Sequence, residues 1–137
     1  MATKITISAL LNAPIEKVWN SWTIPEHITK WNFAIDTWHC PTASNDLKVG
    51  GKYIARMEAK DGSLGFDFEA LYDTVIDKQE LTYTMTDGRK AKTIFVDKGS
   101  ETSVTTIFDA ESENPVEMQQ QGWQSILNNF KKYVESN

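Results

Sequence analysis

The sequence predicts an α+β domain in which a curved antiparallel sheet wraps around a long C-terminal helix and encloses a cavity. Three observations predict this fold class: an apolar-aromatic helical pattern near the start, a strand-rich middle, and a long amphipathic helical pattern at the end. Residues 46–51 mark the passage from the first part to the second. Because such a shape leaves room between sheet and helix, the expected function is to hold a small, mostly apolar molecule.

The length of 137 residues suits one domain, which we expect to span residues 1–137. The formal net charge of −5 comes from interspersed acidic and basic residues, a pattern that argues against nucleic acid as a partner. The first residues lack the apolar core of a signal peptide, and no stretch approaches the ~18 apolar residues of a membrane span. A single cysteine, Cys40, excludes an internal disulfide, so we expect a cytoplasmic location.

The N-terminal third predicts one strand followed by two short helices. Residues 5–11 alternate closely enough between apolar and polar side chains to form a strand of period two. Pro14 suits the first turn of a helix, where its missing N–H is not needed. Four apolar residues follow at helical spacing: Ile15, Val18, Trp19 and Trp22. A second helix is expected to begin at Pro25, with Ile28 and Trp31 on one face.

Residues 32–48 show no sustained hydrophobic period and contain several turn formers, so they are interpreted as a long connection. Long loops inside compact domains tend to be functional, and this one is expected to form a lid or rim over the cavity. Gly50 and Gly51 end the connection, because glycine adopts backbone angles that a side chain would forbid.

Five runs of strand character follow, at residues 52–59, 66–76, 81–86, 91–96 and 102–110. Short turns separate them, so consecutive strands are expected to be antiparallel neighbours. In the first two runs the covered face is assigned to Tyr53, Ala55, Met57, Phe66, Phe68, Ala70 and Tyr72. The solvated face is assigned to Arg56, Glu58, Asp67, Glu69 and Asp73. A slip of one residue would exchange the two sets and place these charges in the cavity.

The last segment predicts the helix that covers the sheet. Residues 113–115 have the character of a helix start. An apolar stripe then recurs at steps of four, three and four residues: Trp123, Leu127, Phe130 and Val134. About twenty residues make a helix near 30 Å long, enough to cross a curved sheet from end to end.

Several short motifs, in this order along the chain, carry a resemblance to a known family. They are Pro14 through Trp19, Pro25-Glu26, Asp46-Leu47-Lys48-Val49-Gly50-Gly51, Asp61-Gly62, Leu81-Thr82-Tyr83-Thr84, Thr102-Ser103-Val104-Thr105, and Gly122-Trp123 followed by Leu127. The chain resembles the bacterial proteins related to the C-terminal domain of the activator of Hsp90 ATPase, within the START-like or Bet v 1-like (SRPBCC) superfamily. The resemblance implies the helix-grip fold: a curved antiparallel sheet, two short helices after the first strand, and a long C-terminal helix closing an internal cavity.

The resemblance implies function less narrowly than fold. Relatives include binders of lipids, hormones and polyketides, some cyclases and aromatases, toxin-antitoxin-like partners and co-chaperones. The chain lacks the additional N-terminal domain of the eukaryotic co-chaperone, so Hsp90 is not the expected partner.

His39 and Cys40 are the residues closest in type to a nucleophile with its base, or to metal ligands. Adjacent side chains in an extended segment point apart, and a base must reach its nucleophile by a hydrogen bond. His27 is the only other histidine, which leaves too few ligands for zinc. We therefore predict no catalytic residue, no metal and no cofactor, with the pair packed in the interior or at the rim.

The cavity candidates fall into three groups. The strands supply Met57, Phe66, Phe68, Tyr83 and Met85, whose alternative is plain core. One flank of the last helix supplies Met118, Gln121, Gly122 and Ser125, although an exposed Gln121 is the simpler interpretation. The mouth is assigned to Trp31, Phe33 and Trp38. Gly122 costs about 1 kcal/mol of helix propensity relative to alanine, and such a glycine often admits a neighbour close to the backbone.

Three functional hypotheses follow. The first is a noncatalytic binding protein for an apolar, aromatic or lipid-like ligand, with groups such as Tyr83 and Gln121 setting its orientation. The second is an enzyme that uses the cavity for cyclisation, dehydration or hydrolysis, and it requires a buried acid, base or tyrosine that faces the void and transfers a proton. The third is an interaction module, either a homodimer or a chaperone partner, and it requires an exposed apolar surface.

Overall fold

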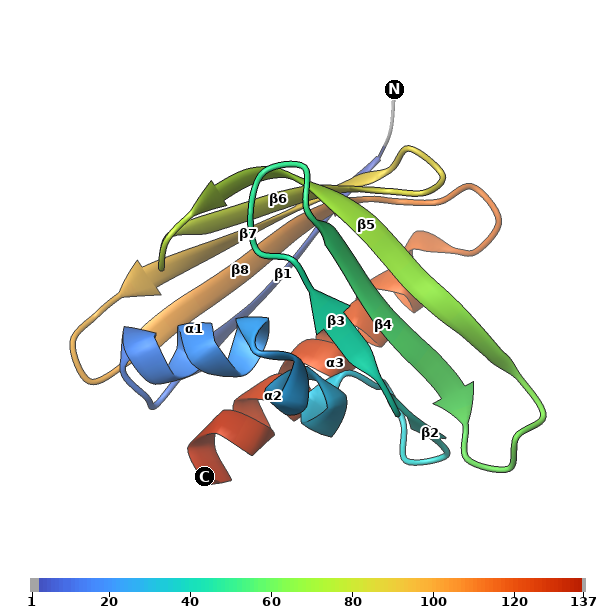
Figure 1. Ribbon diagram of the computed structural model, residues 1–137, viewed down its shortest axis with the longest axis horizontal. Coiled ribbons are helices and arrows are strands. Elements are labelled where there is room, and N and C mark those ends of the chain that lie inside the picture. Colours follow the sequence, from blue (N-terminus) through green and yellow to red (C-terminus); the bar gives the residue numbers. More distant parts are fainter. Residues whose placement is uncertain (1–2, 137) are drawn as a thin grey trace.

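The structure, a computed structural model, describes residues 3–136, and within them the chain forms one curved sheet and three helices (Figure 1). The strands are β1 Lys4–Leu11, β2 Trp38–His39, β3 Ala43–Asn45, β4 Lys52–Ala59, β5 Gly65–Ile76, β6 Glu80–Met85, β7 Lys90–Asp97 and β8 Thr102–Asp109. The helices are α1 Ile15–Thr23, α2 Pro25–Trp31 and α3 Val116–Ser136.

The sheet is antiparallel throughout, in the order β1-β8-β7-β6-β5-β4-β2, with β3 pairing to β4 beside β2. β4 to β8 are consecutive hairpin neighbours, and β1 completes the sheet by pairing with β8. The sheet arches over α3, while α1 and α2 lie beside the C-terminal half of that helix (Figure 1). The predicted α+β helix-grip fold is therefore confirmed.

The connection predicted for residues 32–48 contains two short strands that the sequence pattern did not indicate. Ala43 pairs with Ala55, and Trp38 pairs with Ala59. Both ladders join residues far apart in the chain, and neither strand is long enough to show a period of two. Pairing with β4 thus orders the connection along the edge of the sheet.

The Gly50-Gly51 turn fixes the start of β4 against β5. Gly50 has φ of +82°, and a Cβ on Gly51 would lie 2.0 Å from the carbonyl oxygen of Asp46, so both positions require glycine. The N–H of Gly50 donates to the carbonyl of Tyr72, and the N–H of Tyr72 donates to the carbonyl of Gly51. The pairing register of β5 shifts between Tyr72 and Thr74, directly beside this contact.

The predicted apolar stripe of α3 forms the core between helix and sheet. Leu127, Phe130 and Val134 are fully buried, and the ring of Trp123 stacks on Phe108 with centroids 3.8 Å apart. Phe130 lies edge-on to Trp22 and Trp31, at centroid distances of 4.9 and 4.8 Å. This aromatic cluster anchors α3 to α1 and α2.

Side chains of α3 cover the free edge of β1. Gln120, Gln124 and Lys131 donate to the carbonyls of Thr6, Ser8 and Leu10, which are alternate residues of the strand. Glu135 accepts from the N–H of Asn12, just past the end of β1. An open strand edge is a template for pairing with another chain, and this row of hydrogen bonds occupies it.

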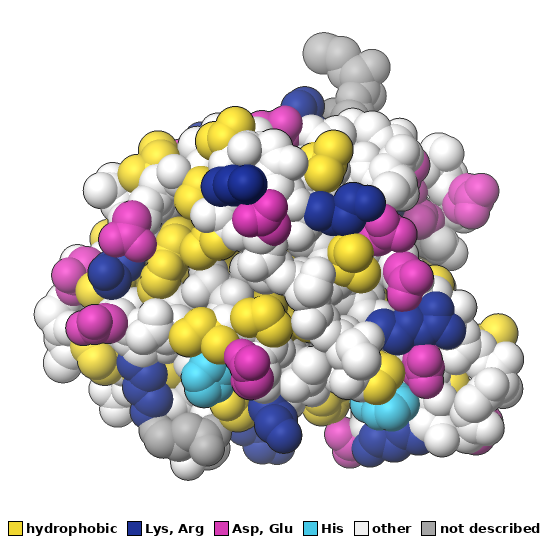
Figure 2. Space-filling view, in the orientation of Figure 1, with side chains coloured by type: hydrophobic (Ala, Val, Ile, Leu, Met, Phe, Trp, Pro, Cys, Tyr) yellow, Lys and Arg dark blue, Asp and Glu magenta, His cyan; other side chains and the backbone are white. Residues whose placement is uncertain are grey.

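The charges on the face seen in Figure 2 are interspersed, with basic and acidic side chains alternating among apolar ones. This distribution agrees with the mixed pattern of the sequence. In the part of the chain that the structure describes, no helix has both the length and the apolarity needed to cross a membrane.

Candidate functional site

A cavity of about 210 Å³ lies between the concave face of the sheet and the helices. α3 therefore does not pack flush on the sheet. The strands line it with Ile7, Tyr53, Met57, Phe66, Phe68, Tyr72, Leu81, Tyr83, Thr93 and Thr106. The helices and the residue after α2 contribute Trp22, Trp31, Asn32, Trp123, Ile126 and Leu127. Phe66 lines the cavity yet is 51% exposed, so the cavity opens to solvent near the tip of the β4–β5 hairpin.

Five predicted site residues are brought together by this cavity: Trp31, Met57, Phe66, Phe68 and Tyr83. The strand residues share its wall because β4, β5 and β6 are neighbours and alternate positions face α3. Alternation in the sequence also places Tyr53 and Tyr72 on this face, although neither is among the predicted site residues. The remaining lining residues come from β1, β6, β7, β8, the helices and Asn32, where local patterns did not separate cavity from core.

Three other predicted residues lie near the cavity without lining it. Met85 is buried in the core of the sheet. Trp38 packs its ring against Phe66, with centroids 6.2 Å apart, and so lies beside the mouth. Phe33 follows α2, and its backbone carbonyl accepts a hydrogen bond from the side chain of Asn129 on α3.

The structure places the predicted flank of α3 outside the cavity. Met118 is 58% exposed, while Gln121 and Ser125 line a shallow depression on the surface of the helix. Helix rotation explains the difference: stacking of Trp123 on Phe108 turns Ile126 and Leu127 inward instead. Gln121 is therefore not an orienting group for a cavity ligand, and the simpler interpretation of an exposed glutamine holds.

Gly122 was expected to admit a neighbour close to the backbone, but a Cβ at this position would meet no atom within 4 Å. No strand, side chain or backbone among the described residues presses against it. We predict that Gly122→Ala raises the free energy of unfolding by about 1 kcal/mol, since alanine is the better helix former and restricts the unfolded chain. Urea denaturation measures this change.

The matched control for Gly122→Ala is Gly51→Ala, whose Cβ would lie 2.0 Å from a backbone carbonyl oxygen. It is expected to destabilise the protein, because that backbone atom cannot move aside without disturbing the turn. A loss of stability in Gly122→Ala would show that the glycine admits a close neighbour after all.

Polar groups on the cavity wall are paired with one another or with nearby residues. The side-chain amide of Asn32 donates to the hydroxyl of Tyr53 over 2.9 Å, and the hydroxyl of Tyr72 donates to Asn45 over 2.7 Å. The hydroxyls of Thr93 and Thr106 bond to each other over 2.9 Å. In contrast, the hydroxyl of Tyr83 has no hydrogen-bond partner among residues 3–136.

The cavity wall carries no charged side chain: it contains no Asp, Glu, His, Lys or Arg among the described residues. Burial raises the pKa of Tyr83, and burial followed by the neighbouring Tyr83 and Tyr72 phenols raises the pKa of Tyr53. These phenols therefore stay neutral near pH 7: the hydroxyl of Tyr53 accepts a hydrogen bond from Asn32, and the hydroxyl of Tyr83 keeps a proton that it can donate. Of the buried acid, base or tyrosine that the enzyme hypothesis requires, only tyrosines line this cavity among the described residues: Tyr53, Tyr72 and Tyr83.

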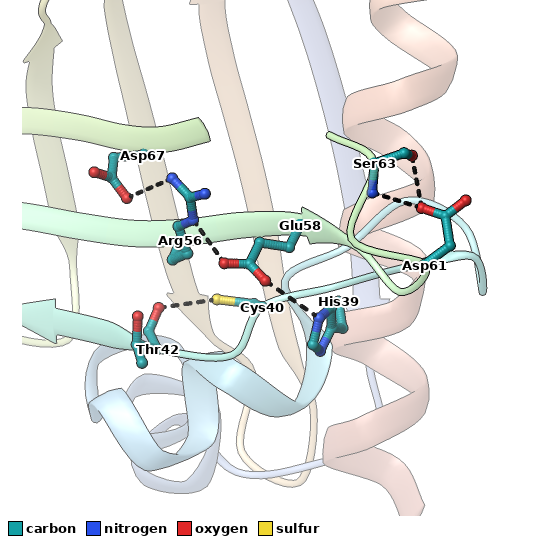
Figure 3. A network of polar contacts seen from close by, with 8 residues as sticks. All are labelled: His39, Cys40, Thr42, Arg56, Glu58, Asp61, Ser63 and Asp67. Carbon is teal, nitrogen blue, oxygen red and sulfur yellow. Dashed lines mark hydrogen bonds and ion pairs between the residues drawn. The ribbon is translucent and has the colours of Figure 1, made fainter. Parts of the chain in front are cut away.

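His39 and Cys40 point apart, as their adjacency in an extended segment predicted (Figure 3). Cys40 is 2% exposed, its thiol donates to the carbonyl of Thr42 over 3.4 Å, and burial raises its pKa to about 11. His39 instead lies 3.9 Å from the carboxylate of Glu58. The pair therefore does not form a nucleophile with its base, and no group of three metal-ligating side chains occurs within the described range.

Ion pairs on the outer face of the sheet confirm the predicted face assignment of β4 and β5. Arg56 donates from Nε to Glu58 over 2.8 Å, and its guanidinium lies 3.5 Å from Asp67 (Figure 3). His39 and Asp67 are the chain neighbours of Trp38 and Phe66, which pack beside the cavity mouth. The ion pairs of Arg56, Glu58, Asp67 and His39 thus lie on the outer face of the same strand ends whose inner face forms the cavity mouth.

The fold and the cavity together define an α+β helix-grip domain of the START-like class. The family described as activator of Hsp90 ATPase homolog 1-like protein matches residues 12–135, and the chain belongs to this family. No curated protein matches the chain.

Solved structures agree with this assignment. The solution structure of the AHSA1-like protein from Aeromonas hydrophila is 42% identical, with a TM-score of 0.92, over 98% of this chain and 93% of that one. A protein from Cytophaga hutchinsonii is 49% identical, with a TM-score of 0.84 and the same coverage of both chains. A protein from Chromobacterium violaceum, at 20% identity and a TM-score of 0.86 over 98% of this chain and 99% of that one, shares the fold.

Proposed function

We propose that this protein is a noncatalytic binding protein that holds a small, uncharged and mostly aromatic molecule between the sheet and α3. The observation that carries the proposal is the 210 Å³ cavity, whose wall is aromatic and aliphatic and bears no charge among the described residues. Domains with the fold of this family commonly bind ligands in the corresponding cavity. Apolar walls supply affinity, while a few polar groups set orientation.

The volume limits the size of the ligand. A dry apolar cavity of about 150 Å³ accommodates benzene, so the same filling of 210 Å³ corresponds to roughly eight non-hydrogen atoms. A ligand that reaches into the open mouth beside Phe66 can be somewhat larger, up to about a dozen atoms. One- or two-ring aromatics fit this range, whereas a sterol or a long-chain fatty acid requires the cavity to widen.

Intrinsic fluorescence tests the proposal, because Trp22, Trp31 and Trp123 line the cavity. We predict that one- and two-ring aromatics change the tryptophan emission saturably and raise the thermal midpoint. At 100 times its dissociation constant a ligand adds about 2.7 kcal/mol to the folded state, which corresponds to a few degrees. Palmitate and cholesterol are the size controls.

The outcomes separate the alternatives. A shift with palmitate alone would contradict the size limit, and no shift with any compound would contradict the cavity as a binding site. A cytoplasmic location, where the single thiol of Cys40 stays reduced, is part of the proposal. No observation on the described residues carries the homodimer or the chaperone partner, so neither is proposed.

A further inference from the structure

We propose that the cavity selects uncharged aromatic ligands that bear a hydrogen-bond-accepting oxygen, such as a ketone, and that the hydroxyl of Tyr83 is the donor that orients them. This inference rests on the proposed function and specifies its ligand class. Three observations support it: the position of Tyr83 on the cavity wall, the hydrogen bonds that the other wall residues already make, and the lack of charged side chains among the described residues of the wall.

Tyr83 stands on the central strand of the sheet, with three strands on either side of β6 in the main path. Its ring lies nearly parallel to that of Tyr53, at a centroid distance of 6.1 Å and an interplanar angle of 19°. Phe68 and Tyr72 border it at 5.9 and 6.2 Å. Packing by three rings limits the ways in which the Tyr83 side chain can turn, so its hydroxyl is held in place before a ligand arrives.

The hydrogen-bond inventory singles out this hydroxyl from the other phenols. Tyr53 accepts a hydrogen bond from Asn32 and Tyr72 donates one to Asn45, whereas Tyr83 bonds to none of the described residues. No side-chain nitrogen or oxygen in that range is both buried and without a partner. The hydroxyl of Tyr83 therefore keeps contact with open space, and Tyr83 lines the cavity. A ligand oxygen that accepts a hydrogen bond from this hydroxyl supplies the partner that the apolar wall lacks.

The nature of the wall excludes a charged acceptor. No lysine, arginine or histidine lines the cavity among residues 3–136, so a carboxylate would lose its hydration without gaining a cation. Burial is the largest cause that raises the pKa of Tyr53, Tyr72 and Tyr83, and at Tyr83 it outweighs the charge of Arg89, which lowers the pKa. A neutral carbonyl accepts the hydrogen bond at a much lower desolvation cost.

Calorimetric titration of three compounds of similar size tests the inference: 1-indanone with a carbonyl, indane without one, and benzoate with a charge. We expect wild-type protein to bind 1-indanone about 3- to 10-fold more tightly than indane, the range for one neutral hydrogen bond. Benzoate is expected to bind more weakly than either. In Tyr83→Phe the preference for 1-indanone over indane should disappear, while the affinity for indane stays the same.

Tyr72→Phe is the matched control, because the hydroxyl of Tyr72 already bonds to Asn45. It should retain the preference for 1-indanone. Equal binding of 1-indanone and indane to wild-type protein, or a preference that persists in Tyr83→Phe, would overturn the inference and leave the cavity proposal standing. Failure of both neutral compounds to bind would instead overturn the proposed function, and the unchanged affinity for indane verifies that the variant is folded.

Discussion

Replacing Phe130 with alanine will lower the free energy of unfolding by about 3–5 kcal/mol, the range for truncating a buried phenylalanine. Phe130 is 0% exposed, and its ring contacts both Trp22 and Trp31 edge-on. The loss has two sources. The free energy gained by burying the phenyl ring is lost, and a void remains between the two indole rings where the phenyl ring was. Urea denaturation followed by circular dichroism measures the change.

Met118→Ala is the control for this prediction, since Met118 belongs to the same helix and is 58% exposed. Its effect should stay within about 0.5 kcal/mol, as for surface substitutions in general. A loss below 1 kcal/mol in Phe130→Ala would contradict the account, because α3 would then not depend on this aromatic cluster for its attachment to α1 and α2.

Filling the cavity from the helix side is expected to weaken ligand binding strongly while the fold persists. Ile126 lines the cavity from α3 and is partly buried, so an indole at this position occupies part of the cavity that Tyr83 also lines. We predict that Ile126→Trp weakens the binding of 1-indanone by more than about tenfold, or 1.4 kcal/mol. Overpacking costs about 1–3 kcal/mol of stability, and calorimetry together with circular dichroism separates the two effects.

Met118→Trp is the matched control, because it adds the same side chain to the same helix outside the cavity. It should bind 1-indanone as the wild-type protein does. Unchanged affinity in a folded Ile126→Trp variant would place the ligand somewhere other than the cavity under α3.

The fold could be predicted from the sequence because its main elements are long enough to show a period. The alternation of β4 and β5 assigned Met57 and Phe68 to the covered face, and the stripe of α3 identified its buried residues. β2 and β3 escaped prediction, because two- and three-residue strands are stabilised by ladders to β4 instead of by a local pattern. Long-range pairing of this kind leaves no signal in a short window.

The candidate site was predicted on its strand side and mistaken on its helix side. Alternation fixes which face of a strand is covered, but a helix with apolar residues around more than one stripe can rotate. The stacking of Trp123 on Phe108 decides that rotation, and it joins residues 15 positions apart in the sequence. The sequence also could not predict which phenol lacks a hydrogen-bond partner. That distinction arises because Asn32 and Asn45, which are distant in the chain, bond to Tyr53 and Tyr72 and leave Tyr83 unpaired among the described residues.

The proposed ligand lies between α3 and the concave face of the sheet. Intermolecular nuclear Overhauser effects from 1-indanone to protein with labelled methyl groups test this position most directly. Contacts are expected from the ligand to the methyl groups of Met57, Ile126 and Leu127, all of which line the cavity. Contacts confined to exposed methyl groups such as those of Met118 and Val116, in a saturated sample, would contradict this position.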